Sequence, residues 1–226
     1  MAGSSKFSPV LEPDLYRPDR EFFRADATTV APLLLGGILT HRHEEGEVAL
    51  RITEVEAYLG VGLDPGSHAH RGKGKRNATM FGPPGHLYVY FTYGMHACAN
   101  VVCSPDGVAS AVLLRAGEIV DGEQYARDRR TRTAAAMVPR RDLARGPARL
   151  SVAMGITLSD NGADALDSRF ELRVPYAPCD HLVGPRTGVS GPGGSELYPW
   201  RYWLPNEETV SPYRKHVQRS REALHK

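Results

Sequence analysis

The order of apolar and polar residues divides the chain into short strands, a few short helices and one long irregular segment. Residues 26–37, DATTVAPLLLGG, predict a helix with an aspartate cap, an apolar body and a double-glycine end, provided that it starts late enough to tolerate Pro32. Residues 38–58 predict two strands joined by a turn near Glu45 and Gly46. Residues 60–85 hold too many glycines, prolines, histidines and lysines for regular structure. A loop of that length is expected to be functional.

Further strands and two helices are expected in the rest of the chain. Three strand-like runs, residues 86–94, 95–103 and 107–116, are separated by Tyr93-Gly94 and by the turn sequence SPDG. Residues 122–132 and 146–156 have helical patterns, and after Asn161 short strands such as FELRVP and PWRYWLP alternate with turns. This pattern predicts one α/β domain of the α+β type over residues 19–226: a curved, mainly antiparallel sheet with flanking helices and a protruding β-hairpin. Residues 1–18, rich in serine and proline, are expected to form a flexible arm.

Alternation within RITEVEAYLG, residues 51–60, draws attention to two carboxylates. In a strand, one face would carry Ile52, Glu54, Glu56 and Tyr58, and the other Thr53, Val55 and Ala57. A carboxylate beside aromatic groups suits hydrolysis of a glycosidic bond, in which it activates water or attacks the sugar. Charged residues on a solvated strand face are the alternative.

The predicted hairpin carries several aromatic residues. Tyr88 and Tyr90 share a face, and a core position is favoured for Tyr88. Tyr93 falls at the turn itself and is followed by Met95 and His96. It resembles the wedge that minor-groove proteins push between base pairs.

Arg115 ends an apolar run in which Leu113 shares its face. A buried arginine demands an anionic partner, so we expect a carboxylate or a phosphate beside Arg115. A structural ion pair explains this residue almost equally well. The glycine-lined GVSGPGG, residues 188–194, is a weak phosphate-loop signal because no GK[ST] follows.

Composition narrows the class of protein. The 226 residues are 41% hydrophobic and 24% charged, without the run of about 20 apolar residues that a membrane helix needs and without the basic-then-apolar opening pattern expected of a signal peptide. Three cysteines without a CxxC motif make a zinc site or a disulfide framework improbable, so we expect no metal and a reducing compartment. Eight arginines against two acids lie between residues 127 and 149, and HRGKGKRN forms a second basic cluster. Such clusters suit a polyanion such as nucleic acid, or a solvated basic surface.

Several segments, in the same order, resemble the alkyladenine (3-methyladenine) DNA glycosylase family. They are RITEVEAYLG, DPGSHAHRGKGKRN, MFGPPGHLYVYFTYGMHACANVV, AVLLRAGE, RDLARGPARLSVAMGI, and GPRTGVSG with PWRYW. The resemblance extends over roughly residues 19–211, which is most of the chain. Val55 departs from the threonine that is more frequent in the family, but it points away from the glutamate face. We therefore expect no loss of chemistry.

The resemblance implies a role for each of several residues. Glu56 matches the general base, which activates the water that attacks the deoxyribose C1′, while Arg115 and the backbone carbonyl of Thr187 help to hold that water. The residues implied at the base pocket are Tyr58, His68 and Tyr90 as its walls, and Asn100 and Leu113 as positions that bear on which purines are accepted. Tyr93 matches the residue inserted into the duplex in place of the flipped nucleotide, with Met95 and His96 beside it. Lys73 and the arginine-rich segment would contact phosphates.

We therefore expect a monofunctional DNA glycosylase of base-excision repair. It would flip damaged purines (3-methyladenine, 7-methylguanine, with hypoxanthine and ethenoadenine as further candidates) out of double-stranded DNA and leave an abasic site by inverting hydrolysis, without lyase activity or a cofactor. We expect a monomer without membrane contact, in a bacterial cytoplasm or a eukaryotic nucleus. A non-catalytic nucleic-acid-binding module of the same fold is the alternative. A glycosidase of free nucleosides or sugars is less favoured because it would have no use for Tyr93.

Overall fold

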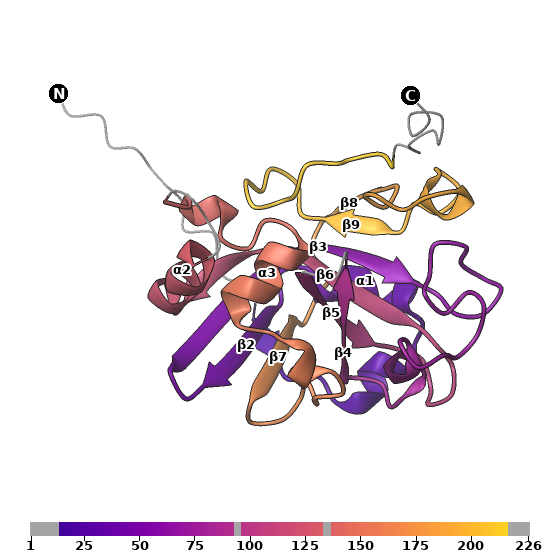
Figure 1. The fold of residues 1–226 in the computed structure, drawn as a ribbon, viewed down its shortest axis with the longest axis horizontal. Helices are drawn as coiled ribbons and strands as arrows, with labels where there is room; N and C mark the ends of the chain where they lie inside the picture. Colours follow the sequence, from indigo (N-terminus) through magenta and orange to yellow (C-terminus); the bar gives the residue numbers. More distant parts are fainter. Residues whose placement is uncertain (1–13, 93–95, 133–136, 217–226) are drawn as a thin grey trace, which may run out of the picture.

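The fold is built on one antiparallel sheet, shown in a computed structural model that describes residues 14–92, 96–132 and 137–216 (Figure 1). In these residues the sheet has nine strands in the order β1-β7-β2-β3-β6-β5-β4, and β9 pairs with both β3 and β8. The strands are β1 (Leu15–Tyr16), β2 (Ile38–His43), β3 (Gly46–Tyr58), β4 (Leu87–Thr92), β5 (His96–Val102), β6 (Ala111–Asp121), β7 (Phe170–Pro175), β8 (Leu182–Gly184) and β9 (Arg201–Trp203). The α-helices are α1 (Ala27–Leu34), α2 (Glu123–Thr131) and α3 (Pro147–Met154). The predicted α+β class, with a mainly antiparallel sheet and flanking helices, is confirmed.

Helix α1 begins at Ala27, directly after its cap, so the expectation that Pro32 requires a late start is wrong. Asp26 Oδ1 accepts the backbone N–H groups of Thr28 at 2.9 Å and Thr29 at 3.0 Å, which fixes the start of the helix. Pro32 then lies in the second turn, where a proline costs about 3 kcal/mol. Burial of apolar side chains such as Val30 against the core offsets that cost.

Strand β3 is paired on both edges at the two carboxylates of interest. One edge pairs with β6 along most of its length. The other edge is divided, because β2 pairs with its first half and β9 pairs with residues 54–56. Glu54 and Glu56 therefore lie in the interior of the sheet, and both are fully buried.

Two bulges beside these carboxylates change which residues share a face. On β3 the extra residue is Thr53, and on β6 it is Arg115. The expected alternation consequently fails at Ile52, which belongs to the hydrophobic core, whereas Glu54 and Glu56 both contact Arg115. The register that defines the bulges pairs Ile52 with Gly117, Glu54 with Ala116 and Val55 with Leu114.

Several elements differ in extent from the predicted ones. Part of the expected arm, Leu15–Tyr16, pairs with β7 as β1, while residues 1–13 lie outside the described part of the chain. Strand β6 runs to Asp121, past the predicted end at residue 116, and β8 was not predicted. The long segment 60–85 is mostly turns, with one short 3-10 helix at Ala78–Phe81.

A buried histidine joins β2 to the end of α3. His41 is fully buried, stacks on the ring of Phe170 with centroids 3.9 Å apart, and its Nδ1 bonds the Met154 carbonyl at 2.9 Å. Burial lowers the pKa of His41 to about 4, so the ring is neutral at pH 7.

No helix among the described residues is long and apolar enough to cross a bilayer.

Candidate active site

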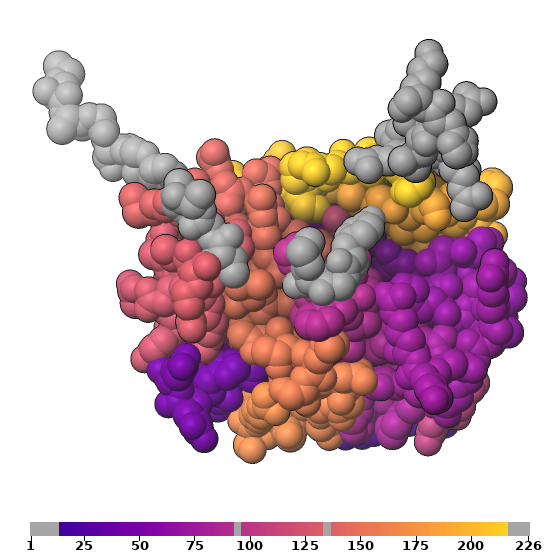
Figure 2. Space-filling model, viewed as in Figure 1, coloured from indigo at the N-terminus to yellow at the C-terminus, as the bar shows by residue number. Residues whose placement is uncertain are grey.

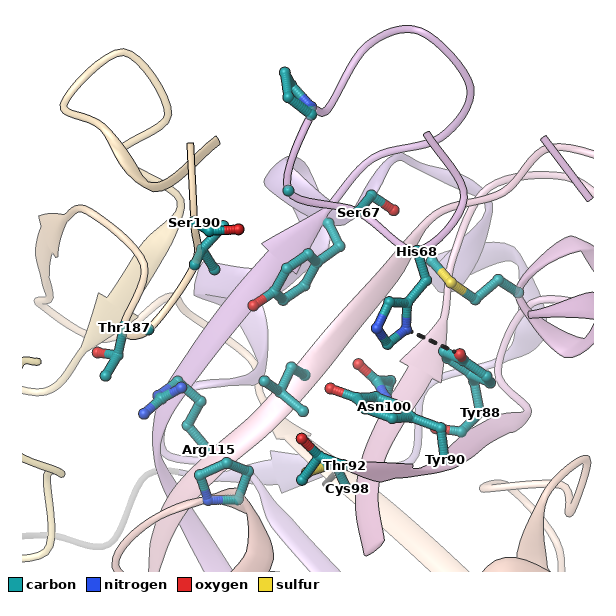
Figure 3. Close-up of a pocket in the computed structure, with 18 residues that line it drawn as sticks. Ser67, His68, Tyr88, Tyr90, Thr92, Cys98, Asn100, Arg115, Thr187 and Ser190 are labelled. Atoms are coloured by element: carbon teal, nitrogen blue, oxygen red, sulfur yellow. Dashed lines mark hydrogen bonds between the residues drawn. The ribbon is translucent and has the colours of Figure 1, made fainter. Parts of the chain in front are cut away.

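A cavity of about 500 Å³ opens where the ends of β3 to β6 meet the loop after β3 and the segment after β8 (Figure 3). His68, Tyr88 and Tyr90 lie together on one side of it, and Thr187 and Ser190 lie on the opposite side. Of the residues that the sequence assigned to the site, the cavity wall includes Tyr58, His68, Tyr90, Asn100, Leu113, Arg115 and Thr187.

One side of the cavity is aromatic. Tyr88 and Tyr90 stack with ring centroids 5.3 Å apart, and the His68 ring meets Tyr90 edge-on at 4.6 Å. His68 Nδ1 and the Tyr88 hydroxyl share a hydrogen bond of 3.1 Å (Figure 3). Burial raises the pKa of Tyr88 to about 12, and close packing together with the charge of Arg76 lowers the pKa of His68. At pH 7 this side is therefore aromatic and uncharged, which suits a stacked purine.

Asn100 and Leu113 lie side by side across neighbouring strands. Asn100 pairs with Tyr88 on β4 and with Leu113 on β6, so the three side chains are set by the strand register. Asn100 Nδ2 donates to the Tyr88 carbonyl at 2.9 Å, and this bond fixes the orientation of the amide. Both Asn100 and Leu113 are buried and line the cavity.

Glu56 lies behind the cavity wall and bonds three of the residues that form it. Its Oε1 accepts the backbone N–H of Thr187 at 2.6 Å and lies 3.2 Å from Arg115 Nη1. Its Oε2 accepts the Tyr58 hydroxyl at 2.8 Å. Burial and the Glu56 charge raise the pKa of Tyr58, which keeps that phenol a donor. Because a carboxylate oxygen has two lone pairs, Glu56 retains capacity for one more donor, such as a water.

Glu54 is held in a different way from Glu56. Its Oε1 accepts Arg115 Nε at 2.9 Å and Arg201 Nε at 2.7 Å, and its Oε2 accepts the backbone N–H of Ser211 at 2.7 Å. Burial alone would raise the pKa of Glu54, but the charges of Arg115 and Arg201 lower it below its usual value. Glu54 is thus an ionised structural anion, and Arg115 has the carboxylate partners that its buried position requires.

Arg186 is a residue of the site that the sequence reasoning missed. It is almost fully buried, and it binds Asp64 through two hydrogen bonds of 2.6 Å each. Its guanidinium also lies over the Tyr58 ring, 4.5 Å from the centroid. The pair joins the loop after β3 to the segment that carries Thr187, and these regions, purple and orange to yellow, adjoin on the surface (Figure 2). Arg186 stands in a loop without strand periodicity, so nothing in the local pattern predicted its burial.

The residues assigned to DNA contact are placed in part. Tyr93 and Met95 lie outside the described residues, so the wedge stays a prediction. His96 is exposed at the start of β5, and Lys73 is exposed with its ammonium 5.8 Å from the Phe81 ring centroid. Some arginines of the basic segment form internal ion pairs, which reduces the charge left for phosphates: Arg127 with Glu123, Arg140 with Glu118 and Glu123, and Arg145 with Asp142.

The cysteines do not form a reactive or metal-binding group in the described residues. Cys98, Cys103 and Cys179 are free thiols, and no cluster of three or more His, Cys, Asp or Glu side chains there could hold a metal ion. Cys98 lines the cavity, and burial raises the pKa of its thiol to about 11. It is therefore protonated at neutral pH and is a poor nucleophile.

Comparison with known proteins identifies the family. The family model described as methylpurine-DNA glycosylase (MPG) matches residues 21–208. The chain belongs to this family. It is 61% identical to a protein of Leifsonia xyli subsp. xyli, over 89% of this chain and 95% of that protein. It is 50% identical to a protein of Streptomyces avermitilis, over 94% of this chain and 99% of that protein. Both relatives carry the name "Putative 3-methyladenine DNA glycosylase". The family expected from the sequence motifs is confirmed, and the chain is by family a DNA glycosylase, a hydrolase of base-excision repair.

Proposed function

We propose that the protein is a monofunctional purine-DNA glycosylase. It flips a damaged purine out of duplex DNA and hydrolyses the N-glycosidic bond with a water activated by Glu56. The observation that carries the proposal is the setting of Glu56, a fully buried carboxylate bonded to Tyr58, Arg115 and Thr187 behind the wall of an aromatic cavity. Chemistry at a nucleotide C1′ requires the base to leave the stack, and a cavity of about 500 Å³ lies in the usual range for a ligand of that size.

The aromatic wall favours alkylated purines as substrates. Methylation at N3 or N7 makes the purine cationic, and an aromatic face such as that of Tyr90 attracts a cation. His68 is neutral at pH 7 and therefore does not repel it. A cationic base is also a good leaving group, which supports 3-methyladenine and 7-methylguanine as preferred substrates over hypoxanthine and ethenoadenine.

Water is the nucleophile in this proposal, and the displacement is single and inverting. Glu56 takes the proton of the water, while Arg115 and the carbonyl of Thr187 orient it. The buried Thr187 hydroxyl has no hydrogen-bond partner within the described residues, so it offers the water a further contact. Glu54 cannot serve as a second catalytic carboxylate because Arg115, Arg201 and Ser211 enclose it. Since the described residues that line the cavity include no lysine, we expect no Schiff base and an intact strand.

The duplex is held around the cavity mouth. Tyr93, which lies between β4 and β5 in the sequence, is the proposed wedge that replaces the flipped nucleotide, with Met95 and His96 beside it. Lys73 and the exposed arginines of the basic segment are the proposed phosphate contacts.

Strand cleavage of damaged oligonucleotides tests this function. Duplexes with a single 7-methylguanine or hypoxanthine are incubated with the protein, and the strands are resolved with and without alkali. Breaks that appear only after alkali are expected. Breaks without alkali would refute a monofunctional enzyme. Binding without any break would support the non-catalytic module instead.

A further inference from the structure

The last described residues of the chain contact the groups around Glu56. Residues 209–214, here called the C-terminal strap, follow directly after the family-model match, which ends at residue 208. The strap is anchored at its start, where the Thr209 hydroxyl bonds the Thr53 hydroxyl at 2.9 Å and the Val210 carbonyl accepts Arg145 Nε at 2.9 Å. Thr209 and Ser211 are both buried, so the strap is packed into the domain.

Ser211 completes the set of partners around Arg115. Arg115 Nη2 donates to the Ser211 hydroxyl at 3.1 Å, and that hydroxyl donates to Glu54 Oε1 at 3.0 Å. The three guanidinium nitrogens of Arg115 therefore have three separate partners: Nε bonds Glu54, Nη1 faces Glu56 and Nη2 bonds Ser211. Because the guanidinium is a rigid planar fork, fixing Nε and Nη2 also fixes the position of Nη1 against Glu56.

The other end of the strap reaches the second donor to Glu56. The Arg214 carbonyl accepts the backbone N–H of Gly188 at 2.8 Å. Gly188 directly follows Thr187, whose N–H bonds Glu56 Oε1 at 2.6 Å, and it lines the cavity. Its φ of +73° and the open space around its Cβ position leave the backbone there few restraints of its own.

We propose that the C-terminal strap is a positioning element for base excision, with Ser211 as its central positioning residue. It holds the Arg115 fork at one end and the Thr187 backbone at the other, so that both donors converge on Glu56 Oε1. Ser211 touches neither the cavity nor Glu56, and acts through Arg115 and Glu54. The inference rests on the proposed glycosylase function, in which misplacing a catalytic group by about 1 Å can cost about 100-fold in rate.

Single-turnover excision of 7-methylguanine by Ser211→Ala tests the strap. Removing the hydroxyl frees Arg115 Nη2, so we expect excision about 10-fold to 100-fold slower. Affinity for duplex DNA with an abasic-site analogue should stay within about twofold, since the Ser211 backbone bonds to Glu54 and Arg201 remain. Ser211→Thr, which keeps a hydroxyl, should restore most of the rate. The matched control is Ser195→Ala. The wild-type Ser195 hydroxyl bonds the Pro192 carbonyl, away from Arg115, so the excision rate of this variant should not change.

Two shortened chains provide a second measurement. A chain that ends after Lys215 keeps every strap contact described above and should excise at the full-length rate. A chain that ends after Val210 loses Ser211 and Arg214, and its excision rate should fall at least as far as that of Ser211→Ala.

The possible outcomes distinguish a failure of the positioning role of the strap from a failure of the proposed function. Full excision by Ser211→Ala, or by the chain ending at Val210, would overturn the positioning role. Ser211→Ala could also excise slowly, bind DNA more weakly and melt at a lower temperature, with Ser211→Thr failing to restore the rate. That result would show that Ser211 is merely structural, and it would also overturn the positioning role. An inactive wild-type protein would instead refute the glycosylase function on which the strap's role rests.

Discussion

Glu54 and Glu56 stand two residues apart on β3 and bind the same guanidinium through different nitrogens. Arg115 Nε donates to Glu54 at 2.9 Å, while Nη1 lies 3.2 Å from Glu56. Glu54 is enclosed by Arg115, Arg201 and Ser211, whereas all three partners of Glu56 line the cavity. The shared arginine thus separates a structural carboxylate from a candidate general base.

Glu56→Gln should abolish excision and preserve DNA binding. The amide keeps the shape of the side chain but cannot take a proton from water, and loss of a general base costs about 100-fold to 10,000-fold in rate. Single-turnover excision of 7-methylguanine and binding to an uncleaved duplex are the two measurements. Exposed Glu196→Gln is the matched control, with unchanged excision expected. Normal turnover by Glu56→Gln would mean that another group activates the water.

Glu54→Gln should act mainly on stability. The substitution leaves Arg115 and Arg201 buried without their full counter-charge, and breaking a buried pair in this way costs about 3–5 kcal/mol. Denaturant unfolding measures the loss. For comparison, Glu118→Gln removes a partly exposed partner of Arg51 and should cost less than about 1 kcal/mol. Equal effects of the two substitutions would contradict the structural role of Glu54.

Tyr90→Leu should slow the excision of a cationic base more than the excision of a neutral base. Losing the aromatic face removes stacking worth about 1–3 kcal/mol for any base, and a cationic base also loses its cation–π attraction. Excision of 7-methylguanine should therefore fall by about 10-fold more than excision of hypoxanthine. Tyr90→Phe keeps the face and should behave like the wild type. A uniform decrease for both bases would exclude a cation–π contribution at this position.

Acidification from about pH 6.5 to about pH 4 should destabilise the fold through His41. In the unfolded chain this histidine has its ordinary pKa of 6.5, whereas burial holds the folded pKa at about 4. The unfolded state thus binds more protons in this window, so stability falls as pH falls, by up to about 3 kcal/mol from this group.

Urea unfolding at pH 7 and pH 4.5 measures this effect. The difference between the two pH values should shrink in His41→Leu, whose side chain does not titrate. It should persist in His216→Gln, because His216 is exposed. An unchanged difference in His41→Leu would assign the acid sensitivity to other groups.

Local signals in the sequence were sufficient for most elements of the fold. The Asp26 cap and the glycines after residue 35 define α1, and the turn between β2 and β3 lies at Glu44 and Glu45, beside the predicted position. Alternation failed at Ile52 because a bulge depends on the partner strand, and nothing in the local sequence marks Thr53 or Arg115 as the extra residue. Strand β8 is only three residues long, too short for a periodic pattern.

The sequence predicted those residues of the candidate site that lie in family motifs. It did not predict contacts between segments that are far apart in the chain. The motifs indicated Glu56, Arg115 and the aromatic wall, and the structure brings these residues together around one cavity. The Asp64–Arg186 pair joins residues 122 positions apart, and no local pattern connects them. Ser211 likewise reaches Glu54 across 157 positions, which only the folded chain reveals.

One edge of β3 is shared between β2 and β9, and these two strands are synthesised at very different times. Glu56 leaves the ribosome 131 residues before Thr187, and β9, which covers the same edge, is made later still. Until then the edge of β3 beside the two carboxylates stays open to water. A nascent chain of that length therefore contains the aromatic residues of the cavity wall but lacks one of the three partners of Glu56. The partners that hold Glu56 and cover its strand edge are therefore complete only when the chain has been made as far as Thr187 and β9.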